Sequence, residues 1–345
     1  MKRILFVDYS NLIARSFYAF NVYTEAGKHS GLFYGSLRLI YSKIRQYNIT
    51  DVCVFLDKKP YWKTSIFPEY KQGRKGFQTG DLTEDFNENA KDLEFLLPHL
   101  QFNVISFPSF EADDLIAAFV HKFKDSCEKI YMYSGDHDLY QLVDDKVYFI
   151  KAQSGDKDIL VTPENVEEMI ETTSEEYTNV LALSGDKGDG VPSIFAIREG
   201  NSETGYSWKN PKIIMSEGKI IKLLKNNKLE NLLSGKVNPA KGVGKATEEL
   251  FINISDIHKE NFERNFKLVN LRNGGEKMKV IEENHSIFKL DKKIFNEELL
   301  KEMLKKYECK SIKIDSKFPY YYVTDNTNKP VIDRNSFLSL LKKNK

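Results

Sequence analysis

Nine acids stand out in this chain: Asp8, Asp57, Glu111, Asp113, Asp114, Asp136, Asp138, Asp186 and Asp189. Their carboxylate oxygens are the ligands that Mg²⁺ and Mn²⁺ prefer, whereas zinc usually takes His or Cys, and neither lies at ligand spacing among them. If the fold brings these acids together, like charges repel by several kcal/mol per close pair unless cations lie between them. The set therefore predicts a divalent metal site.

Each acidic motif has an ordinary structural explanation when it is taken alone. In FEADDLIAAFV the acids of a first helical turn would complement the helix dipole. In SGDHDLYQLV and SGDKGDG the aspartates would cap a helix or form a turn. An EF-hand calcium loop is excluded for SGDKGDG, because the third ligand position counted from Asp186 is Gly188. Only the whole set favours a metal site.

The elements that would position these acids are short apolar strands that end in an acid. They are ILFVD at 4–8, VCVFLD at 52–57 and KIYMYSGD at 129–136. Segments with helical apolar spacing, 31–47 and 114–123, lie between the strands. This alternation predicts an α/β fold with a mostly parallel central sheet and helices on both faces. Because ligands bind at the carboxyl ends of such strands, Asp8, Asp57 and Asp136 would converge at one edge.

After about residue 160 the pattern becomes typical of helices. TPENVEEMI has Thr162 as a cap and Pro163 at the first helical position, and the chain reads as mainly helical as far as Asn270. Further helices are expected at 297–306 and 334–345. We therefore expect three regions: an α/β core over 1–160, a helical lobe over 161–290 and a C-terminal extension over 291–345.

Overall composition identifies no partner, because 51 Lys and Arg residues nearly balance 50 Asp and Glu residues. The three cysteines, Cys53, Cys127 and Cys309, fit reduced thiols better than a disulfide framework or a zinc knuckle. The N-terminus MKRILFVDYS begins like a signal peptide, but Asp8 interrupts its apolar run, and no later stretch could span a bilayer. We expect a cytoplasmic protein with no membrane partner.

The motifs FVDYSN, FLDKKPYWKTSIFPEYKQGRK, FEADDLIA, SGDHDLYQL and LSGDKGDGV occur in order between Phe6 and Val191. In order and spacing the chain resembles the flap-endonuclease or 5′-nuclease family. That family includes phage ribonuclease H enzymes and the 5′-nuclease domain of bacterial DNA polymerase I. The resemblance implies a PIN-like 5′-nuclease fold with a helical arch and a helical second lobe.

The resemblance also implies a function. The family hydrolyses phosphodiester bonds at 5′ ends and flaps, in DNA and in RNA·DNA hybrids. We therefore expect a structure-specific 5′-to-3′ exonuclease and flap endonuclease with ribonuclease H-type activity, which removes primers during replication in a bacterial or phage-infected cell. A sliding clamp and a single-strand-binding protein are candidate partners, and the C-terminal SFLSLLKKNK is a candidate clamp-docking helix.

Two Mg²⁺ ions, for which Mn²⁺ can substitute, would be held by the acids that match the family motifs. The resemblance assigns the first ion to Asp8, Asp57, Glu111 and Asp113, with Asp136 shared or close by. It assigns the second ion to Asp138, Asp186 and Asp189, partly through water, and leaves Asp114 to orient ligands.

Basic and aromatic residues alternate over 58–80, which suits binding of single-stranded nucleic acid. An ordinary solvated loop is the alternative. In the family this segment forms the arch, and Lys71 and Arg74 match the positions that contact the scissile phosphate. The expected nucleic-acid contacts of the segment are Lys58, Tyr61, Trp62, Lys63, Tyr70, Lys71, Arg74 and Lys75.

The family also places a DNA-binding helix-three-turn-helix hairpin a few residues after the last aspartate motif. Here GVPSIFAIREG has no such turn, but KGVGKATEELF at 241–251 has one, with Gly242, Gly244 and Lys245 of the required types. We therefore expect an insertion at about 193–240, which either extends the duplex-binding face or is a solvated helical segment. K⁺ is a candidate ligand of the hairpin.

Two other functions are considered. A junction-binding replication factor with a degenerate, catalytically weak site is disfavoured, because all nine acids are present. A phosphatase with an aspartate nucleophile is disfavoured because that chemistry needs a second Asp two residues after Asp8, and this position is Ser10.

Overall fold

The computed structural model describes residues 2–73, 76–153, 157–201, 205–209, 215–283 and 295–312. These residues form two compact units, each assembled from separate stretches of the chain. The first unit contains the described residues of Met1–Lys59, Phe77–Thr162 and Asn273–Lys345. The second unit contains those of Pro60–Gly76 and Pro163–Arg272.

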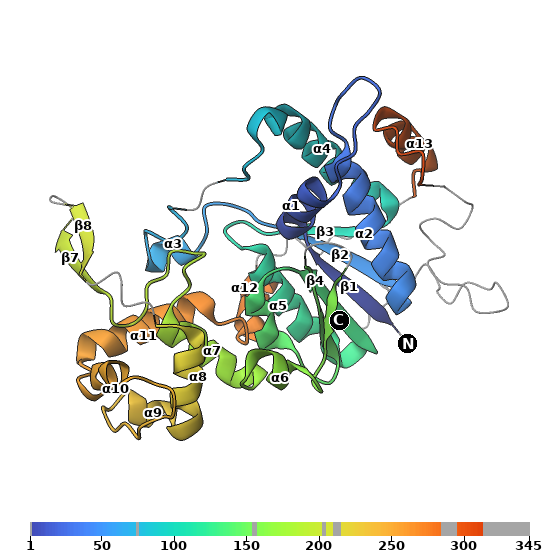
Figure 1. The fold of residues 1–345 in the computed structure, drawn as a ribbon. Coiled ribbons are helices and arrows are strands. Elements are labelled where there is room, and N and C mark those ends of the chain that lie inside the picture. Colours follow the sequence, from blue (N-terminus) through green and yellow to red (C-terminus); the bar gives the residue numbers. More distant parts are fainter. Residues whose placement is uncertain are drawn as a thin grey trace. The chain divides into compact units, whose positions relative to one another are not determined.

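The first unit is built on a six-stranded sheet (Figure 1). Its strands are β1 (Arg3–Asp8), β2 (Asp51–Leu56), β3 (Asn103–Ser106), β4 (Lys129–Ser134), β5 (Val147–Lys151) and β6 (Ile159–Val161). Their order is β3-β2-β1-β4-β5-β6, and all neighbouring pairs are parallel except β5 and β6. The order reverses direction between β1 and β4, which is the point where such sheets bind ligands. The predicted parallel sheet is confirmed.

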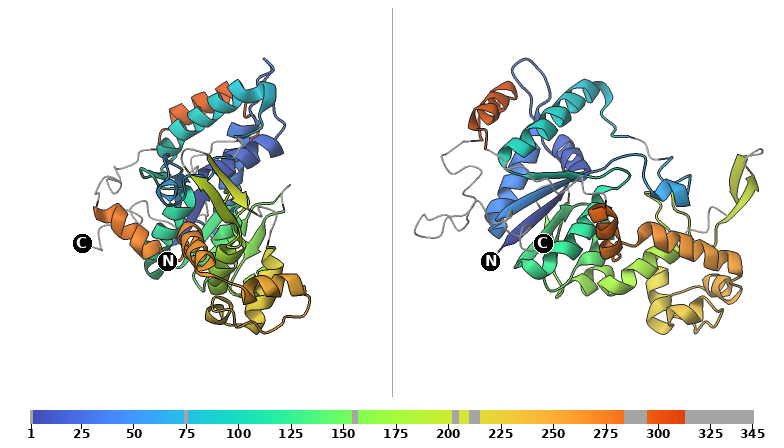
Figure 2. Two further views of the ribbon diagram at one scale, coloured as in Figure 1. Left: turned by 90° about the vertical axis from the view of Figure 1, so that its left-hand side faces the viewer. Right: turned by 180° about the vertical axis from the view of Figure 1, so that it is seen from behind.

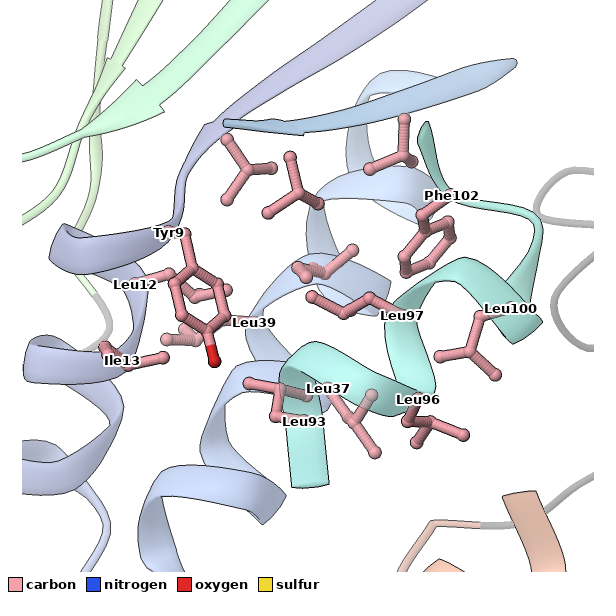
Figure 3. Packing of buried hydrophobic residues seen from close by; sticks show 14 of the residues in the cluster. Tyr9, Leu12, Ile13, Leu37, Leu39, Leu93, Leu96, Leu97, Leu100 and Phe102 are labelled. Carbon is pink, nitrogen blue, oxygen red and sulfur yellow. The ribbon is translucent and has the colours of Figure 1, made fainter. Parts of the chain in front are cut away.

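Helices cover both faces of this sheet, as the alternating pattern of the sequence predicts. The helical elements of the first unit are α1 (Tyr9–Ala19), α2 (Gly31–Tyr47), η1 (Gly80–Leu82), α4 (Thr83–Leu96), η2 (Leu97–Leu100), α5 (Ala112–Phe123), η3 (Lys124–Ser126), η4 (His137–Leu142), α12 (Gly274–Glu283) and α13 (Glu297–Lys306). On one face, Leu12, Leu39 and Leu97 of the α1, α2 and η2 helices pack in one apolar cluster with Val7 of β1 (Figure 3).

The opposite face of the sheet is covered by α5. Phe119 of α5 lies edge-on to Phe6 and Phe55, with ring centroids 6.5 Å and 5.2 Å apart. Helix α12 lies beside α5 (Figures 1 and 2). The two backbones approach closely, because a Cβ atom on Gly274 would lie 2.2 Å from the carbonyl oxygen of Ala117. Helix α12 is therefore packed directly against the middle of α5.

The helix expected at 297–306 is α13, and it is part of the first unit. Asn296 caps it by accepting a hydrogen bond from the Leu299 amide at 3.0 Å. Tyr307, directly after the helix, stacks on Phe33 with ring centroids 4.2 Å apart, and its hydroxyl donates to Asp92 at 2.8 Å. Residues 295–312 thus pack on α2 and α4, whereas the expected helix at 334–345 lies outside the described residues.

The second unit is mainly helical. Its helices are α3 (Lys63–Ile66), α6 (Val166–Ile170), α7 (Ser174–Ser184), α8 (Glu217–Asn226), α9 (Leu229–Leu232), α10 (Lys245–Ile252) and α11 (Asp256–Val269). It also contains an antiparallel hairpin of β7 (Ile197–Asn201) and β8 (Gly205–Lys209). This hairpin lies within the expected insertion at about 193–240, so the alternative of a helical insertion does not hold for these two strands, whose segments IREGN and GYSWK contain strand-forming residues.

Two further expectations need correction. The helix expected from Thr162 and Pro163 begins only at Val166, after Asn165, so the threonine is not its cap. Among the described residues of 58–80, only α3 and the start of η1 are helical, and 60–76 lies in the second unit. Pro60, Pro68 and the glycines of the segment disfavour a longer helix among these described residues. No helix among the described residues is long and apolar enough to cross a membrane.

Candidate metal centre

The carboxyl ends of β1 and β4 meet at Asp8. Asp8 ends β1 and caps α1, and its Oδ1 accepts from the Asn11 amide at 3.1 Å. Its Oδ2 accepts from the Ser134 hydroxyl, at the end of β4, at 2.8 Å. Asn11 in turn accepts from the Gly135 amide at 2.8 Å. These bonds fix Asp8 at the point where the strand order of the sheet reverses.

Asp57 connects the end of β2 to the acidic start of α5. Its Oδ2 accepts from the Ser10 hydroxyl at 2.6 Å, and its Oδ1 accepts from the Ala112 amide, the first of α5, at 2.9 Å. Glu111, directly before α5, is buried, and Asp113 is half-buried. The sequence prediction that strand ends and the α5 terminus share one edge agrees with these contacts.

Glu111, Asp113 and Asp114 each offer an oxygen atom within 4.8 Å of the others, a spacing that suits one metal ion. Asp114 differs from the other two because it is fully buried and its Oδ1 lies 2.8 Å from Nζ of Lys277 on α12. This ion pair competes with a metal for the Asp114 carboxylate. The contact favours the orienting role of Asp114 over direct ligation.

Asp136 and Asp138 follow β4. Asp136 caps η4 by accepting from the Asp138 amide at 3.0 Å, and its own amide donates to Ser134 Oγ at 3.1 Å. Ser134 therefore links Asp136 to Asp8 through one hydroxyl group. The Asx-turn alternative for this motif is present in the structure, and it leaves the carboxylate at the same edge as Asp8.

Electrostatics show how close these carboxylates are to one another. The pKa of Asp8 is raised to about 7, mainly by burial, then by the neighbouring Asp57 charge and, to a smaller extent, by the Asp136 charge. The hydrogen bonds from Asn11 and Ser134 act in the opposite direction. A divalent cation would relieve this repulsion, so the donor set of oxygen atoms fits Mg²⁺ or Mn²⁺.

Asp186 and Asp189 lie in the second unit, in the loop after α7. Asp186 Oδ1 accepts from the Gly188 and Asp189 amides at 2.7 Å and 3.3 Å, which is an Asx turn. Asp189 Oδ2 accepts from the Tyr70 hydroxyl at 2.6 Å and lies 3.1 Å from Nζ of Lys71. This loop is therefore bonded to the segment at 60–76.

The expected nucleic-acid contacts of that segment differ in exposure. Lys58 is exposed, Tyr61 and Trp62 are half-buried, and Arg74 and Lys75 lie outside the described residues. Tyr70 and Lys63 are buried, and Lys63 Nζ lies 5.5 Å from the Tyr70 ring centroid.

The structure does not support base stacking on Tyr70 or a phosphate contact by Lys63, because neither side chain reaches the surface. The basic and aromatic pattern here builds internal cation–π contacts instead.

The expected hairpin turn lies directly before α10. Gly242 has a φ of +80°, Gly244 is the residue before the helix, and Lys245 begins the helix and is exposed. The glycine at a positive φ fits the turn that the sequence predicts.

Residues 3–171 match the family of 5′-3′ exonuclease N-terminal, resolvase-like domains. These residues belong to the 5′-3′ exonuclease family. The matched region contains every first-unit acid of the candidate site, from Asp8 to Asp138.

Curated relatives of the exonuclease family resemble part of the chain. The thermostable DNA polymerase I of Thermus filiformis is 29% identical over 198 residues, which are 57% of this chain and 23% of the polymerase. The 5′-3′ exonuclease of Halalkalibacterium halodurans is 30% identical over 211 residues, which are 57% of this chain and 66% of that protein. The chain therefore spans less than two thirds of the length of either relative.

A solved structure supports the same fold. The flap endonuclease of bacteriophage T5, in a complex with DNA and metal ions, has a TM-score of 0.61 to this chain at 19% identity. The match covers 89% of this chain and 100% of that one. It confirms the 5′-nuclease fold that the sequence motifs predict.

Four residues that support the candidate site escaped the sequence prediction, three of them in the exonuclease-family region and one, Lys277, outside it. Ser10, Asn11 and Ser134 hold the carboxylates of Asp8 and Asp57 in place. The signal for Asn11 was its position three residues after Asp8, where the amide that an N-cap binds lies. Ser10 had no such signal, because its hydroxyl donates to Asp57 on another strand end. Lys277 had no such signal, because a single lysine far along the chain gives no sign of its partner.

Proposed function

We propose that this chain is a divalent-metal-dependent 5′ nuclease that cleaves phosphodiester bonds at 5′ ends and flaps of DNA. The observation that carries the proposal is the convergence of Asp8, Asp57 and the acidic start of α5 at one sheet edge. Membership of residues 3–171 in the 5′-3′ exonuclease family supports the reaction type. The T5 flap endonuclease, which was solved with DNA and metal ions, supports the substrate class.

Within this proposal the first metal is held by Asp8, Asp57, Glu111 and Asp113, with Asp136 shared or close by. The second metal is held by Asp138, Asp186 and Asp189, partly through water, and Asp114 orients ligands. Bound Mg²⁺ would supply an activated water and stabilise the charge on the attacking and leaving oxygens. Ser10, Asn11 and Ser134 keep the carboxylates oriented, so that little reorganisation is needed when substrate binds.

Lys71 would contribute a positive charge toward the scissile phosphate. In the structure its Nζ lies 3.1 Å from Asp189, so binding of substrate and metal requires that this ion pair be exchanged. Lys58, Arg74 and Lys75 are proposed to neutralise the phosphate backbone. Gly242, Gly244 and Lys245 would bind the duplex, with K⁺ as a candidate ligand at the same turn.

The test is cleavage of a 5′-labelled flap duplex by the purified full chain. We expect short 5′ products with Mg²⁺ or Mn²⁺, no products with EDTA, and recovery when the metal is restored. Asp8→Asn and Asp136→Asn should each lower the cleavage rate by at least about a hundredfold, because each removes a charge from the metal ligands. Asp186→Asn should also lower it.

The matched control is Asp256→Asn, which removes an exposed acid that pairs only locally with Lys259 at 2.9 Å. It should cleave at the wild-type rate. Undiminished cleavage by both Asp136→Asn and Asp186→Asn would contradict the metal assignment. Tight flap binding without cleavage in either metal would instead favour the alternative, a junction-binding replication factor.

Ribonuclease H-type activity and primer removal are the finer part of the proposal. A product ladder on three substrates, a DNA flap, a nicked duplex and an RNA-primed duplex, would rank them. Preferential release of ribonucleotides supports primer removal, and cleavage of DNA alone contradicts it. A sliding clamp is proposed as a partner, and loss of clamp stimulation after deletion of the residues beyond Asp333 would support that contact.

A further inference from the structure

The loop that carries Asp186 and Asp189 has little regular structure of its own. It runs from Gly185, directly after α7, to Ala196, directly before β7. The loop folds tightly on itself, because a Cβ atom on Gly185 would lie 2.5 Å from the Val191 carbonyl oxygen. Such a loop has buried backbone carbonyl groups that need donors from elsewhere.

Asn265 of α11 supplies two of these donors. Its Nδ2 donates to the carbonyl oxygen of Ala182, in the last turn of α7, at 3.0 Å. It also donates to the carbonyl oxygen of Pro192 in the loop at 2.8 Å. The side chain is fully buried, so both hydrogen bonds form out of contact with water. Asn265 therefore connects the loop at Pro192 to the last turn of α7, the helix that precedes the loop.

Asn261, one helical turn earlier, holds the end of the loop. Its Nδ2 donates to the carbonyl oxygens of Ile194 and Ala196 at 2.9 Å and 3.1 Å. The loop side chains between them are also packed, since Phe195 lies edge-on to Phe251 with ring centroids 4.9 Å apart. The two asparagines together bind four carbonyl groups at and around the loop.

Arg264 fixes the direction in which both amides point. Its Nη1 donates to Asn261 Oδ1 and its Nη2 to Asn265 Oδ1, each at 2.8 Å. A guanidinium group can only donate, so each amide must turn its oxygen to Arg264 and its NH₂ to the loop. The guanidinium carbon lies 5.1 Å from the Phe67 ring centroid, which holds the arginine in place.

We propose that Asn261 and Asn265, oriented by Arg264, are positioning residues that keep the Asp186 and Asp189 carboxylates in the arrangement that binds metal. The inference rests on the proposed function, and it adds residues that lie outside the acidic motifs. Outer residues that orient metal ligands typically change metal affinity by about 10- to 100-fold when they are replaced.

A general loss of stability in the second unit must be separated from this role. Asn227 offers a matched control, because it is also buried and also clamps a loop in this unit. Its Nδ2 donates to the carbonyl oxygens of Leu223 and Asn238, each at 2.9 Å, and its Oδ1 accepts from the Asn238 amide at 2.6 Å. None of these contacts involves the loop of Asp186.

The experiment is a titration of the full chain with Mn²⁺, with free Mn²⁺ followed by electron paramagnetic resonance. Wild type should bind ions in two classes. In Asn265→Ala the affinity for one class of ions should fall by about 10- to 100-fold, while the affinity for the other class is unchanged. Asn227→Ala should bind both classes as wild type does, although urea unfolding should show both variants to be destabilised.

Arg264→Met serves where Asn265→Ala does not fold, because it removes only the group that orients the two amides. Arg264→Met should lower the affinity for the same class of ions, and Arg264→Lys should lower it less. Wild-type Mn²⁺ binding by folded Asn265→Ala, or an equal loss in Asn227→Ala, overturns the inference alone. A wild-type chain that binds no Mn²⁺ overturns the proposed function and this inference with it.

Discussion

The Asp114–Lys277 pair shows how a single residue contact supports the acidic edge of the sheet. The side chains of Asp114 and Lys277 are 0% and 6% exposed, so the charges are almost wholly removed from water. The pair joins α5 to α12 at the end of α5 that carries Glu111 and Asp113. Removing one partner from such a pair leaves an uncompensated buried charge, which costs far more than the intact pair contributes.

We predict that Lys277→Met lowers the free energy of unfolding by about 3 to 5 kcal/mol, because Asp114 is left buried without its counter-charge. Urea unfolding followed by circular dichroism would measure the change. Adding Asp114→Asn to Lys277→Met should recover a large part of the loss, since the buried charge is then gone.

Lys122→Met is the matched control for this pair. Lys122 lies on α5 and its Nζ is 2.6 Å from Glu282 on α12, but the Glu282 side chain is 52% exposed. Its removal should cost at most about 1 kcal/mol, as is usual for a solvent-exposed pair. Equal losses in the two variants would contradict the role of burial.

At the scale of elements, the close approach of α12 to α5 depends on Gly274. We predict that Gly274→Ala lowers stability by about 1 to 3 kcal/mol, because its Cβ atom would lie 2.2 Å from the Ala117 carbonyl oxygen and force the helices apart. Thermal or urea unfolding would measure the change.

The control for this prediction is Gly218→Ala in α8, where no atom lies within 4 Å of the added Cβ. Alanine is a better helix former than glycine, so Gly218→Ala should leave stability unchanged or raise it by up to about 1 kcal/mol. If Gly274→Ala is as stable as wild type, the helices must be able to separate at little cost.

The elements were predictable where a local pattern determined them. Helices at 31–47 and 297–306 follow from apolar spacing, and β1, β2 and β4 follow from apolar runs that end in acids. The predicted start of α6 was too early, because Thr162 and Pro163 match the pattern of a helix N-terminus, whereas the helix begins at Val166. The β7–β8 hairpin was not predicted, because the lysine-rich segment that follows it has helical apolar spacing and led to a helical prediction for the whole region.

The candidate site was predictable in its acids and much less so in the residues that hold them. Asp8, Asp57 and Asp136 follow strands, and the rule for parallel sheets brings such positions together. Asn261 and Asn265 have a weaker signal, which is a pair of asparagines four residues apart on a helix face that also carries buried Leu268. Their partners are backbone carbonyl groups, which no side-chain pattern reveals.

At the scale of the whole molecule, neither unit is a continuous stretch of chain. The chain passes from one unit to the other at 59–60, 76–77, 162–163 and 272–273. The sequence placed one boundary near 160 and kept 58–80 with the core, because composition changes gradually and tertiary contacts are not visible in it. A fragment cut at that boundary would lack α12 and therefore the Lys277 partner of Asp114.

Charge at this scale also bears on nucleic-acid binding. The net charge is +1, so attraction to DNA must come from local basic groups and not from the molecule as a whole. We predict that Lys245→Ala weakens binding of a flap duplex and reduces the slope of log affinity against log salt by about 1. Fluorescence anisotropy at several KCl concentrations, without divalent metal, would measure the slope.

Lys301→Ala is the control for charge removal, because Lys301 Nζ lies 2.8 Å from Glu297 and 3.0 Å from Glu298 on its own helix. Its removal changes the net charge equally and should leave the salt slope as in wild type. An unchanged slope in Lys245→Ala would exclude a phosphate contact at the hairpin.

The amide group of Asn265 makes both of its N–H bonds to carbonyl groups and is shut off from water. Its two protons should therefore exchange slowly with solvent and give side-chain resonances apart from those of exposed asparagines. These two resonances therefore report on the conformation of the loop that Asn265 contacts. They allow the arrangement of Asp186 and Asp189 to be followed in solution without attaching any label to them.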